Sequence, residues 1–474
     1  MNEKKLGLGS VVATGVGLIV ATSCLLSLGA GSSAIGATFI ISMGLACVLN
    51  ILMALCACEL NAVMPNLTGG LAQYSLASVG PFVTIIVMVG GYLVCNTVIN
   101  ATECAMFGNT IASIFPDIGI PSNVYCVGLL VVLIIANLFG VDMFAKIQNV
   151  VAYGLIGSLT IMGLIGMFGL GSGEVVDQPL VISSEFGDVV GLCGLAFFLF
   201  IGCEYVIPIA PNVDKAKKNI PLGMIISLVL ILVMQSIMVF GFHNYTPWEE
   251  LGQSATPHVL YGAYLLGDVG IVWMAIVSIL AVTSSVNTIL ASLSYVCAGM
   301  AKIELLPKFF GKTNKYGTPY IGLLFIGGID IILNLTGLST SDSLTFFILI
   351  GCVFWMAAYI LTHINVLILR YRLPKAPRTF KVPMTPIPQI LGIIGTIWMI
   401  WNIDSDPSTK KLIYMVSLAV LGGLIIYSWC WVKIKVKRPM FKPYPVKDVM
   451  AMENELYGKA GSDVSRENKE VAYE

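Results

Sequence analysis

The sequence predicts an all-α membrane protein with twelve transmembrane helices. Hydrophobic residues make up 57% of the 474 residues and charged residues only 11%, whereas a soluble domain has about 25% charged residues. Twelve apolar stretches are each close to the roughly 20 residues that a spanning helix needs. Lys and Arg also collect in alternate loops between these stretches, as expected of a multi-pass protein. We therefore expect the lipid bilayer as a partner and no nucleic acid, and the zero net charge adds nothing to this.

The predicted spans follow one another with mostly short loops. The first follows Lys4 and Lys5 and has no small-residue cleavage site after it, which favours a retained span over a signal peptide. The spans cover, in order, residues 7–30, 35–58, 82–110, 122–140, 148–170, 187–209, 220–241, 266–298, 318–337, 342–369, 387–403 and 412–432.

The loop charges predict the orientation of the chain. All but two of the 26 Lys and Arg residues, Lys410 and Lys411, fall on the side of the two termini. Positive charge stays in the cytoplasm in such proteins, so we expect both termini to be cytoplasmic and the protein to lie in the plasma membrane. We expect residues 1–437 to form the transmembrane domain and residues 438–474 a cytoplasmic tail. The tail is basic and then polar, which predicts disorder.

The first span carries polar residues at its middle. It reads GVGLIVATSCLLSLG from Gly15 to Gly29, with Thr22, Ser23 and Cys24 at the centre. Small residues there allow the backbone to unwind and turn its polar groups toward a cavity. They equally allow two helices to pack closely, and this span alone does not decide between the two interpretations.

The sixth span is interrupted in a similar way. The stretch from Gly191 to Pro221 contains Gly194, Gly202 and, near its middle, Glu204. A charge inside a bilayer is costly and usually serves a polar ligand or a moving ion. Interrupted spans at matching positions of two halves point to the midplane site of a transporter.

Several motifs resemble the amino acid–polyamine–organocation permeases. Gly15–Gly29 is similar to the first-helix segment of that superfamily, whose usual core is Gly-Ser-Gly, and the second span ends ACELNAVMPNLTGGLAQYSLASVGP. Spans 4 and 5 contribute GVDMFAKIQNV, the sixth span reads FFLFIGCEYV and is followed by NVDKAKKNIP, and the end of the eighth span contributes LLPKFFGKTNKYGTP. These segments stand in the same order as in the superfamily. Together these matches identify the chain as a member of this superfamily, within its amino acid permease family.

The resemblance implies a fold, a mechanism and a site. It implies a LeuT-type inverted repeat of five plus five helices, covering about 7–170 and 187–369, with two extra helices in 387–432. It implies secondary active transport of amino acids by alternating access around helices 1 and 6, both broken; the alternative is an amine or polyamine permease or exchanger. The substrate carboxylate is expected on the amides near Ala21, Thr22, Ser23 and Cys24. Its amine and side chain are expected to meet Phe198, Leu199, Phe200, Gly202 and Cys203.

The sequence departs from the superfamily pattern at two places. The Gly-Ser-Gly core is Ala21-Thr22-Ser23, so that Cβ atoms line the place expected for the carboxylate. Many proton-coupled relatives have a lysine in the fifth span, near Gly154 or Leu155 here. No span of this chain contains one, which excludes a proton relay through that residue.

Two carboxylates are candidates for coupling or gating. Glu204 is a structural partner for a neighbouring helix, a proton carrier, or an anchor for a cationic ligand, and we place structural or conformational coupling first. The similar arginine–agmatine antiporters have a Glu at this place. Glu103, in the third span, either attracts an amine or lies exposed to water near the outer end.

Thr283 and Ser284 in the eighth span are a candidate sodium site. Sodium-coupled members of this fold use two adjacent hydroxyls there, with carbonyls of the first span. Hydroxyls also bond to their own helix, and this alternative stays open. We expect no cofactor, and a proton or sodium as the coupling ion. No phosphate-binding loop, HExxH motif or nucleophile constellation favours an enzyme, and a channel would lack the saturable flux of a carrier.

Overall fold

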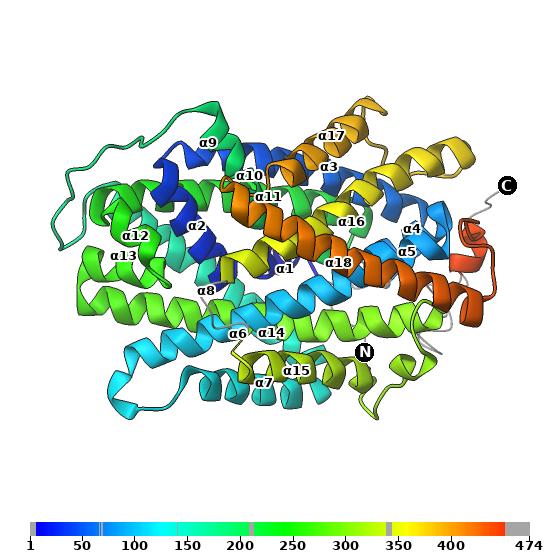
Figure 1. The fold of residues 1–474 in the computed structure, drawn as a ribbon, viewed down its shortest axis with the longest axis horizontal. Coiled ribbons are helices and arrows are strands. Elements are labelled where there is room, and N and C mark those ends of the chain that lie inside the picture. The colour runs from blue at the N-terminus through cyan, green and yellow to red at the C-terminus, as the bar shows by residue number, and fades with distance from the viewer. Residues whose placement is uncertain are drawn as a thin grey trace.

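Long helices that run mostly along one axis make up the protein (Figure 1). The computed structural model describes residues 6–65, 67, 70–139, 141–207, 213–337 and 344–450. The first nine α-helices are α1 (Leu8–Ile19), α2 (Thr22–Ile35), α3 (Phe39–Val63), α4 (Leu71–Val79), α5 (Pro81–Met88), α6 (Cys95–Ile114), α7 (Ser122–Leu138), α8 (Val141–Met167) and α9 (Phe186–Gly191). The next nine are α10 (Cys193–Phe198), α11 (Ala216–Tyr245), α12 (Trp248–Gln253), α13 (Pro257–Leu266), α14 (Asp268–Lys302), α15 (Tyr320–Leu335), α16 (Leu344–Arg372), α17 (Ile387–Trp401) and α18 (Pro407–Trp431). Short π- and 3₁₀-helical segments include η1 (Val89–Val94) and η3 (Cys203–Val206).

Many of these helices are suited to a membrane. Within the described residues, six helices are long and apolar enough to cross one, namely Phe39–Val63, Pro81–Ala112, Ala216–Tyr245, Asp268–Lys302, Leu344–Arg372 and Pro407–Val436. The pair Leu8–Gly17 and Thr22–Ile35, bent by 64°, makes a seventh if it is one span. Five shorter apolar helices are Ser122–Leu138, Val151–Met167, Cys193–Val206, Tyr320–Leu335 and Ile387–Trp401. Every predicted span coincides with one of these helices or pairs, and the count of twelve crossings stays a prediction.

The last two long helices expose large apolar side chains. Trp401 of α17 is 73% exposed, and Ile426 of α18 is 67% exposed. Continuous apolar surface of this kind is unfavourable in water and is typical of a surface that faces lipid. Many polar side chains are instead buried between helices, and several of them pair there. Asn137 of α7, for example, donates to Asn287 of α14 over 2.7 Å.

The helices at the centre bring the two interrupted spans together. α14 packs against α6, α8 and α15, and α11 packs against α1, α3 and α8. Because α1 also contacts η3, the end of the first half of span 1 lies beside the second half of span 6. This arrangement positions the candidate site.

The start of the predicted tail is folded against the helices. The Phe82 amide donates to the carbonyl of Met440 over 3.1 Å, and the Tyr444 amide donates to the carbonyl of Leu76 over 3.1 Å. Tyr444 and Val449 are buried. The disorder expected from residue 438 onward is therefore wrong for 438–450, because apolar side chains among the lysines and prolines find a surface to cover. Residues 451–474, the rest of that tail, lie outside the described residues.

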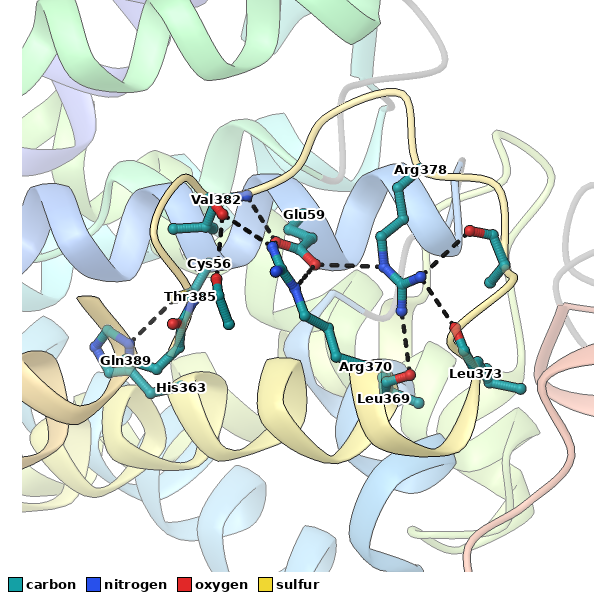
Figure 2. Close-up of polar contacts among 11 residues, drawn as sticks. Cys56, Glu59, His363, Leu369, Arg370, Leu373, Arg378, Val382, Thr385 and Gln389 are labelled. Atoms are coloured by element: carbon teal, nitrogen blue, oxygen red, sulfur yellow. Dashed lines mark hydrogen bonds and ion pairs between the residues drawn. The ribbon is translucent and has the colours of Figure 1, made fainter. Parts of the chain in front are cut away.

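A buried ion-pair cluster joins α3 to the end of α16 (Figure 2). The carboxylate of Glu59 accepts two hydrogen bonds from Arg370, at 2.7 and 2.6 Å, and one from the Val382 amide at 2.7 Å. Nε of Arg378 lies 3.3 Å from the same carboxylate. Burial lowers the pKa of Arg378, and the charge of Glu59 opposes this effect. The cluster fixes the segment between α16 and α17 to α3.

Replacing Glu59 by alanine should strongly destabilise the protein. Glu59→Ala leaves two arginines and a buried amide without their acceptor, and breaking such a buried pair costs about 3–5 kcal/mol. We expect a clearly lower unfolding temperature in detergent, with Glu249→Ala as a control at an exposed position of α12. Equal unfolding temperatures for Glu59→Ala and Glu249→Ala would contradict this account.

Candidate functional site

The first interruption lies between α1 and α2. α1 ends at Ile19 and α2 begins at Thr22, while Val20 and Ala21 have extended backbone with ψ angles of 92° and 169°. The first amides of any helix have no partner within the helix. Those at the start of α2 therefore need acceptors from elsewhere in the protein.

The carboxylate of Glu103 supplies these acceptors. Its Oε2 accepts from the Thr22 amide over 3.2 Å and its Oε1 from the Ser23 amide over 3.1 Å. The Ser23 hydroxyl also donates to Oε1, and the Cys24 amide donates to the carbonyl of Ala21 over 3.1 Å. Glu103 is 0% exposed, so the alternative of a water-exposed position is wrong. A side chain of α6 holds the amides at which the sequence predicted a substrate carboxylate.

The second interruption lies between α10 and η3. α10 ends at Phe198, and η3 begins after Gly202, which has a φ angle of 115°. Few residues other than glycine adopt this backbone conformation, so Gly202 makes the sharp turn possible. The Gly202 amide donates to the Tyr359 hydroxyl of α16 over 3.4 Å.

Glu204 lies just after this turn and is held by three donors. Its Oε1 accepts from the indole of Trp355 over 2.9 Å and from the Tyr92 hydroxyl over 3.3 Å. Its Oε2 accepts from the Tyr359 hydroxyl over 2.7 Å. The rings of Tyr92, Trp355 and Tyr205 pack against one another with centroids 5.8–6.4 Å apart. Glu204 thus connects span 6 to η1 and α16 through hydrogen bonds.

A cavity of about 440 Å³ lies between the two interruptions. Among the residues that the structure describes, Glu103 is the only charged side chain that lines it, and the other walls are mostly apolar or aromatic. Oδ1 of Asn96 has no hydrogen-bond partner among the described residues, and the Tyr205 hydroxyl interacts with the Asn96 side chain. The lining residues are Ile19, Ala21, Ser23, Cys24, Asn96, Ile99, Glu103, Phe198, Ile201, Gly202, Tyr205, Ser285, Ile289 and Trp355.

The cavity contains part of the predicted substrate site. The predicted residues that line it are Ala21, Ser23, Cys24, Phe198, Gly202 and Glu103. Those outside its lining are Thr22, Leu199, Phe200, Cys203 and Glu204. Thr22 directs its hydroxyl to the carbonyl of Ser278 on α14, over 3.4 Å, and Phe200 is fully buried among helices.

Glu204 lines a second cavity, of about 380 Å³, together with Tyr92 and residues of α4. Tyr205 lines both cavities and therefore forms a wall between them.

Sequence reasoning missed several lining residues. Asn96 and Ile99 come from α6, Ser285 and Ile289 from α14, and Trp355 from α16. One signal was present in the sequence. Asn96, Ile99 and Glu103 are spaced by three and four residues, so that they share one face of α6. The contributions of α14 and α16 depend on tertiary packing, which the sequence pattern does not show.

The two candidate sodium residues have different surroundings. The Ser284 hydroxyl lies 3.3 Å from the carbonyl of Gly17 at the end of α1. Thr283 is only half-buried, and Ser285 donates to the carbonyl of Val282 in its own helix over 3.1 Å. Among the described residues, no group of three or more His, Cys, Asp or Glu side chains could hold a metal ion. A sodium role for Thr283 and Ser284 therefore stays a prediction.

Loss of the Glu204 carboxylate should destabilise the protein in proportion to the donors left unpaired. Glu204→Ala leaves two hydroxyls and one indole N–H without an acceptor. Each buried unpaired donor lowers the free energy of unfolding by about 1–3 kcal/mol. Glu204→Gln keeps one acceptor oxygen and should lose less. Tyr359→Phe leaves two groups without a partner, the Gly202 amide and Oε2 of Glu204, and should lose less stability than Glu204→Ala. Unfolding temperatures in detergent measure this order, and a Glu204→Ala variant as stable as the wild type would contradict it.

Known proteins share this sequence and fold. The family model described as "Amino acid permease" matches residues 6–425. The chain is 22% identical to the branched-chain amino acid permease BcaP of Bacillus subtilis over 451 residues, which cover 90% of this chain and 92% of that protein. It is 22% identical to the methylthioribose transporter of Bacillus subtilis over 443 residues, covering 89% and 90% of the two chains. The human Asc-type amino acid transporter 1 is 24% identical over 343 residues, covering 69% of this chain and 64% of that protein.

The fold is similar to that of a solved transporter. A mutant of the manganese transporter of Eremococcus coleocola superposes with a TM-score of 0.58 at 15% identity, over 90% of this chain and 94% of that one. At this identity the similarity concerns the fold alone. The extent of the family match decides the relationship: this chain belongs to the amino acid permease family, and it is a transporter, not an enzyme.

Proposed function

We propose that the protein is a secondary active transporter that moves amino acids or related amines across the plasma membrane. In this proposal it has twelve spans, a LeuT-type inverted repeat with two extra helices, and cytoplasmic termini. Transport proceeds by alternating access around the interruptions of spans 1 and 6. The observation that carries the proposal is that both interruptions border one cavity, which Glu103 lines from a third helix.

The cavity suits a small ligand with an apolar body. Its walls include Ile19, Ile99, Phe198, Ile201 and Ile289, and its polar groups are few. Binding sites for small molecules commonly combine apolar walls with a small number of placed polar groups. The backbone at both interruptions lacks regular helical bonding, so each half-helix is able to tilt without breaking a continuous ladder.

The relatives leave the substrate open within this class. Their names refer to branched-chain amino acids in one case and to methylthioribose in another. The amine alternative is favoured by a specific observation. No Lys, Arg or His of the described part of the chain lines the cavity, and the one charged side chain found there is a carboxylate. A cationic ligand would complement that charge.

Uptake into proteoliposomes tests the function. Radiolabelled leucine and 3-methylbutylamine should be screened with and without sodium and at two external pH values. We expect saturable uptake of at least one of them, and counterflow when the vesicles are preloaded with unlabelled ligand. Flux that rises linearly with concentration and shows no counterflow would indicate a channel and overturn the proposal.

Glu204→Gln should keep the pH profile of uptake. The three donors that converge on Glu204 support a structural acceptor, so we expect lower stability and an unchanged dependence of the uptake rate on pH. Tyr359→Phe is the matched control, because it perturbs the same cluster without removing a carboxylate. A pH profile that becomes flat in Glu204→Gln but not in Tyr359→Phe would instead assign proton handling to Glu204.

Sodium coupling has its own matched pair of variants. If sodium is the coupling ion, Ser284→Ala should remove the sodium dependence, because Ser284 lies beside the Gly17 carbonyl. The adjacent Thr283→Ala tests whether the second hydroxyl takes part. Uptake rates measured in sodium and in choline decide this, and sodium-dependent uptake retained by both variants would exclude the site.

A further inference from the structure

We propose that Glu103 is a built-in carboxylate that occupies the anion-binding end of α2 and excludes ligands with a carboxylate of their own. The preferred substrate is then a cationic amine without a free carboxylate. The substrate half of this inference rests on the proposed transport function, whereas the role of Glu103 at α2 does not.

The donors at the start of α2 are already satisfied. The amides of Thr22 and Ser23 and the Ser23 hydroxyl all donate to Glu103. The Cys24 amide donates to Ala21, and the Ala21 amide donates to the carbonyl of Ile19 over 3.1 Å. An ionised carboxylate is an acceptor only, and it matches a site built from donors at the positive end of a helix. A ligand carboxylate at this place would find no unused amide.

Neighbouring contacts hold Glu103 in position. One turn before it, Asn100 donates to Asp330 of α15 over 2.6 Å. The carbonyl of the next residue, Ala101, accepts from Asn334 of α15 over 3.2 Å. These two bonds fix α6 against α15 at the level of the interruption in span 1. Glu103 therefore reaches α2 from a helix that is itself anchored.

The charges of the cavity disfavour a second carboxylate. Glu103 has no basic partner, because both ion pairs of the described residues belong to Glu59. A ligand carboxylate beside Glu103 would put a second acidic group into a buried site without a basic partner, where an ionised carboxylate is costly. An ammonium group would favour the ionised form of Glu103 and would pair with it. A neutral zwitterion would therefore interact favourably with Glu103 at its amine end and unfavourably at its acid end.

Unpaired acceptors are present for an ammonium group. Asn96 lines the cavity, and its buried Oδ1 has no partner among the described residues. It lies on the same face of α6 as Glu103, two turns away, and Tyr205 lines the same cavity. An ammonium group has three donors and no acceptor, so it complements such a set.

Matched ligand pairs test the specificity. Leucine and 3-methylbutylamine differ only by a carboxylate, and so do valine and 2-methylpropylamine. On purified wild-type protein, isothermal titration should show that each amine binds at least about 100-fold more tightly than its amino acid. In Glu103→Ala, which empties the end of α2, this preference should fall by at least about tenfold. Ser23→Ala, which keeps Glu103 and both amides, should retain the preference for the amine. Wild-type protein that binds leucine as tightly as 3-methylbutylamine would overturn the proposal.

A free carboxylate tests the role of Glu103 without any substrate. Sodium acetate should raise the unfolding temperature of Glu103→Ala above its value in sodium chloride at the same ionic strength, because acetate can take the vacated place. The wild type should show no such difference. If acetate and chloride act alike on the variant, the built-in carboxylate is refuted. Should Glu103→Ala not fold, Glu103→Gln keeps the size without the charge, and an undiminished amine preference in it would likewise refute the proposal.

The two proposals fail in distinguishable ways. Equal uptake of leucine and 3-methylbutylamine by the wild type would support the transport proposal and contradict the proposed amine specificity. Absence of uptake for every ligand, together with acetate stabilisation of Glu103→Ala, would remove the transport proposal and support the role of Glu103 at α2.

Discussion

The contact between Glu103 and the start of α2 is the interaction on which the centre of the molecule depends. A chain that leaves helical geometry inside a membrane exposes amides that lipid does not satisfy. Here a carboxylate from α6 accepts from two of them and from a hydroxyl. The interruption in span 1 is thereby tied to α6, and α6 is tied to α15 through Asn100 and Asp330. A local irregularity in one helix thus sets the relative position of four helices, α1, α2, α6 and α15.

The second interruption is stabilised by different chemistry. Gly202 provides the turn, and α16 provides donors through Tyr359 and Trp355. One interruption therefore receives an acceptor from a neighbouring helix, while the carboxylate after the other receives donors. The two spans occupy corresponding places in the predicted halves, yet their surroundings are not equivalent. The resulting cavity has a polar end near α2 and aromatic walls near η3.

The sequence predicted the helices well and the site only in part. Apolar length located the apolar helices, and glycine placement pointed to the two places where regular helix ends, because both depend on local composition. The position of Glu103 depended on how deep α6 sits against α2, which hydropathy does not specify. Phe200 and Cys203 were predicted to face the substrate, and they lie outside the lining of the cavity, to which Ile201 and Tyr205 contribute. The folded part of the tail was missed because lysines and prolines concealed a few well-spaced apolar residues.

The folded tail is attached to a helix that also lines the second cavity. Residues 438–450 hold the carbonyl of Leu76, near the end of α4, while Leu71 and Ala72 at the beginning of the same helix line the second cavity. α4 has only nine residues. The C-terminal segment is therefore attached within about two helical turns of the cavity wall that includes Glu204 and Tyr205.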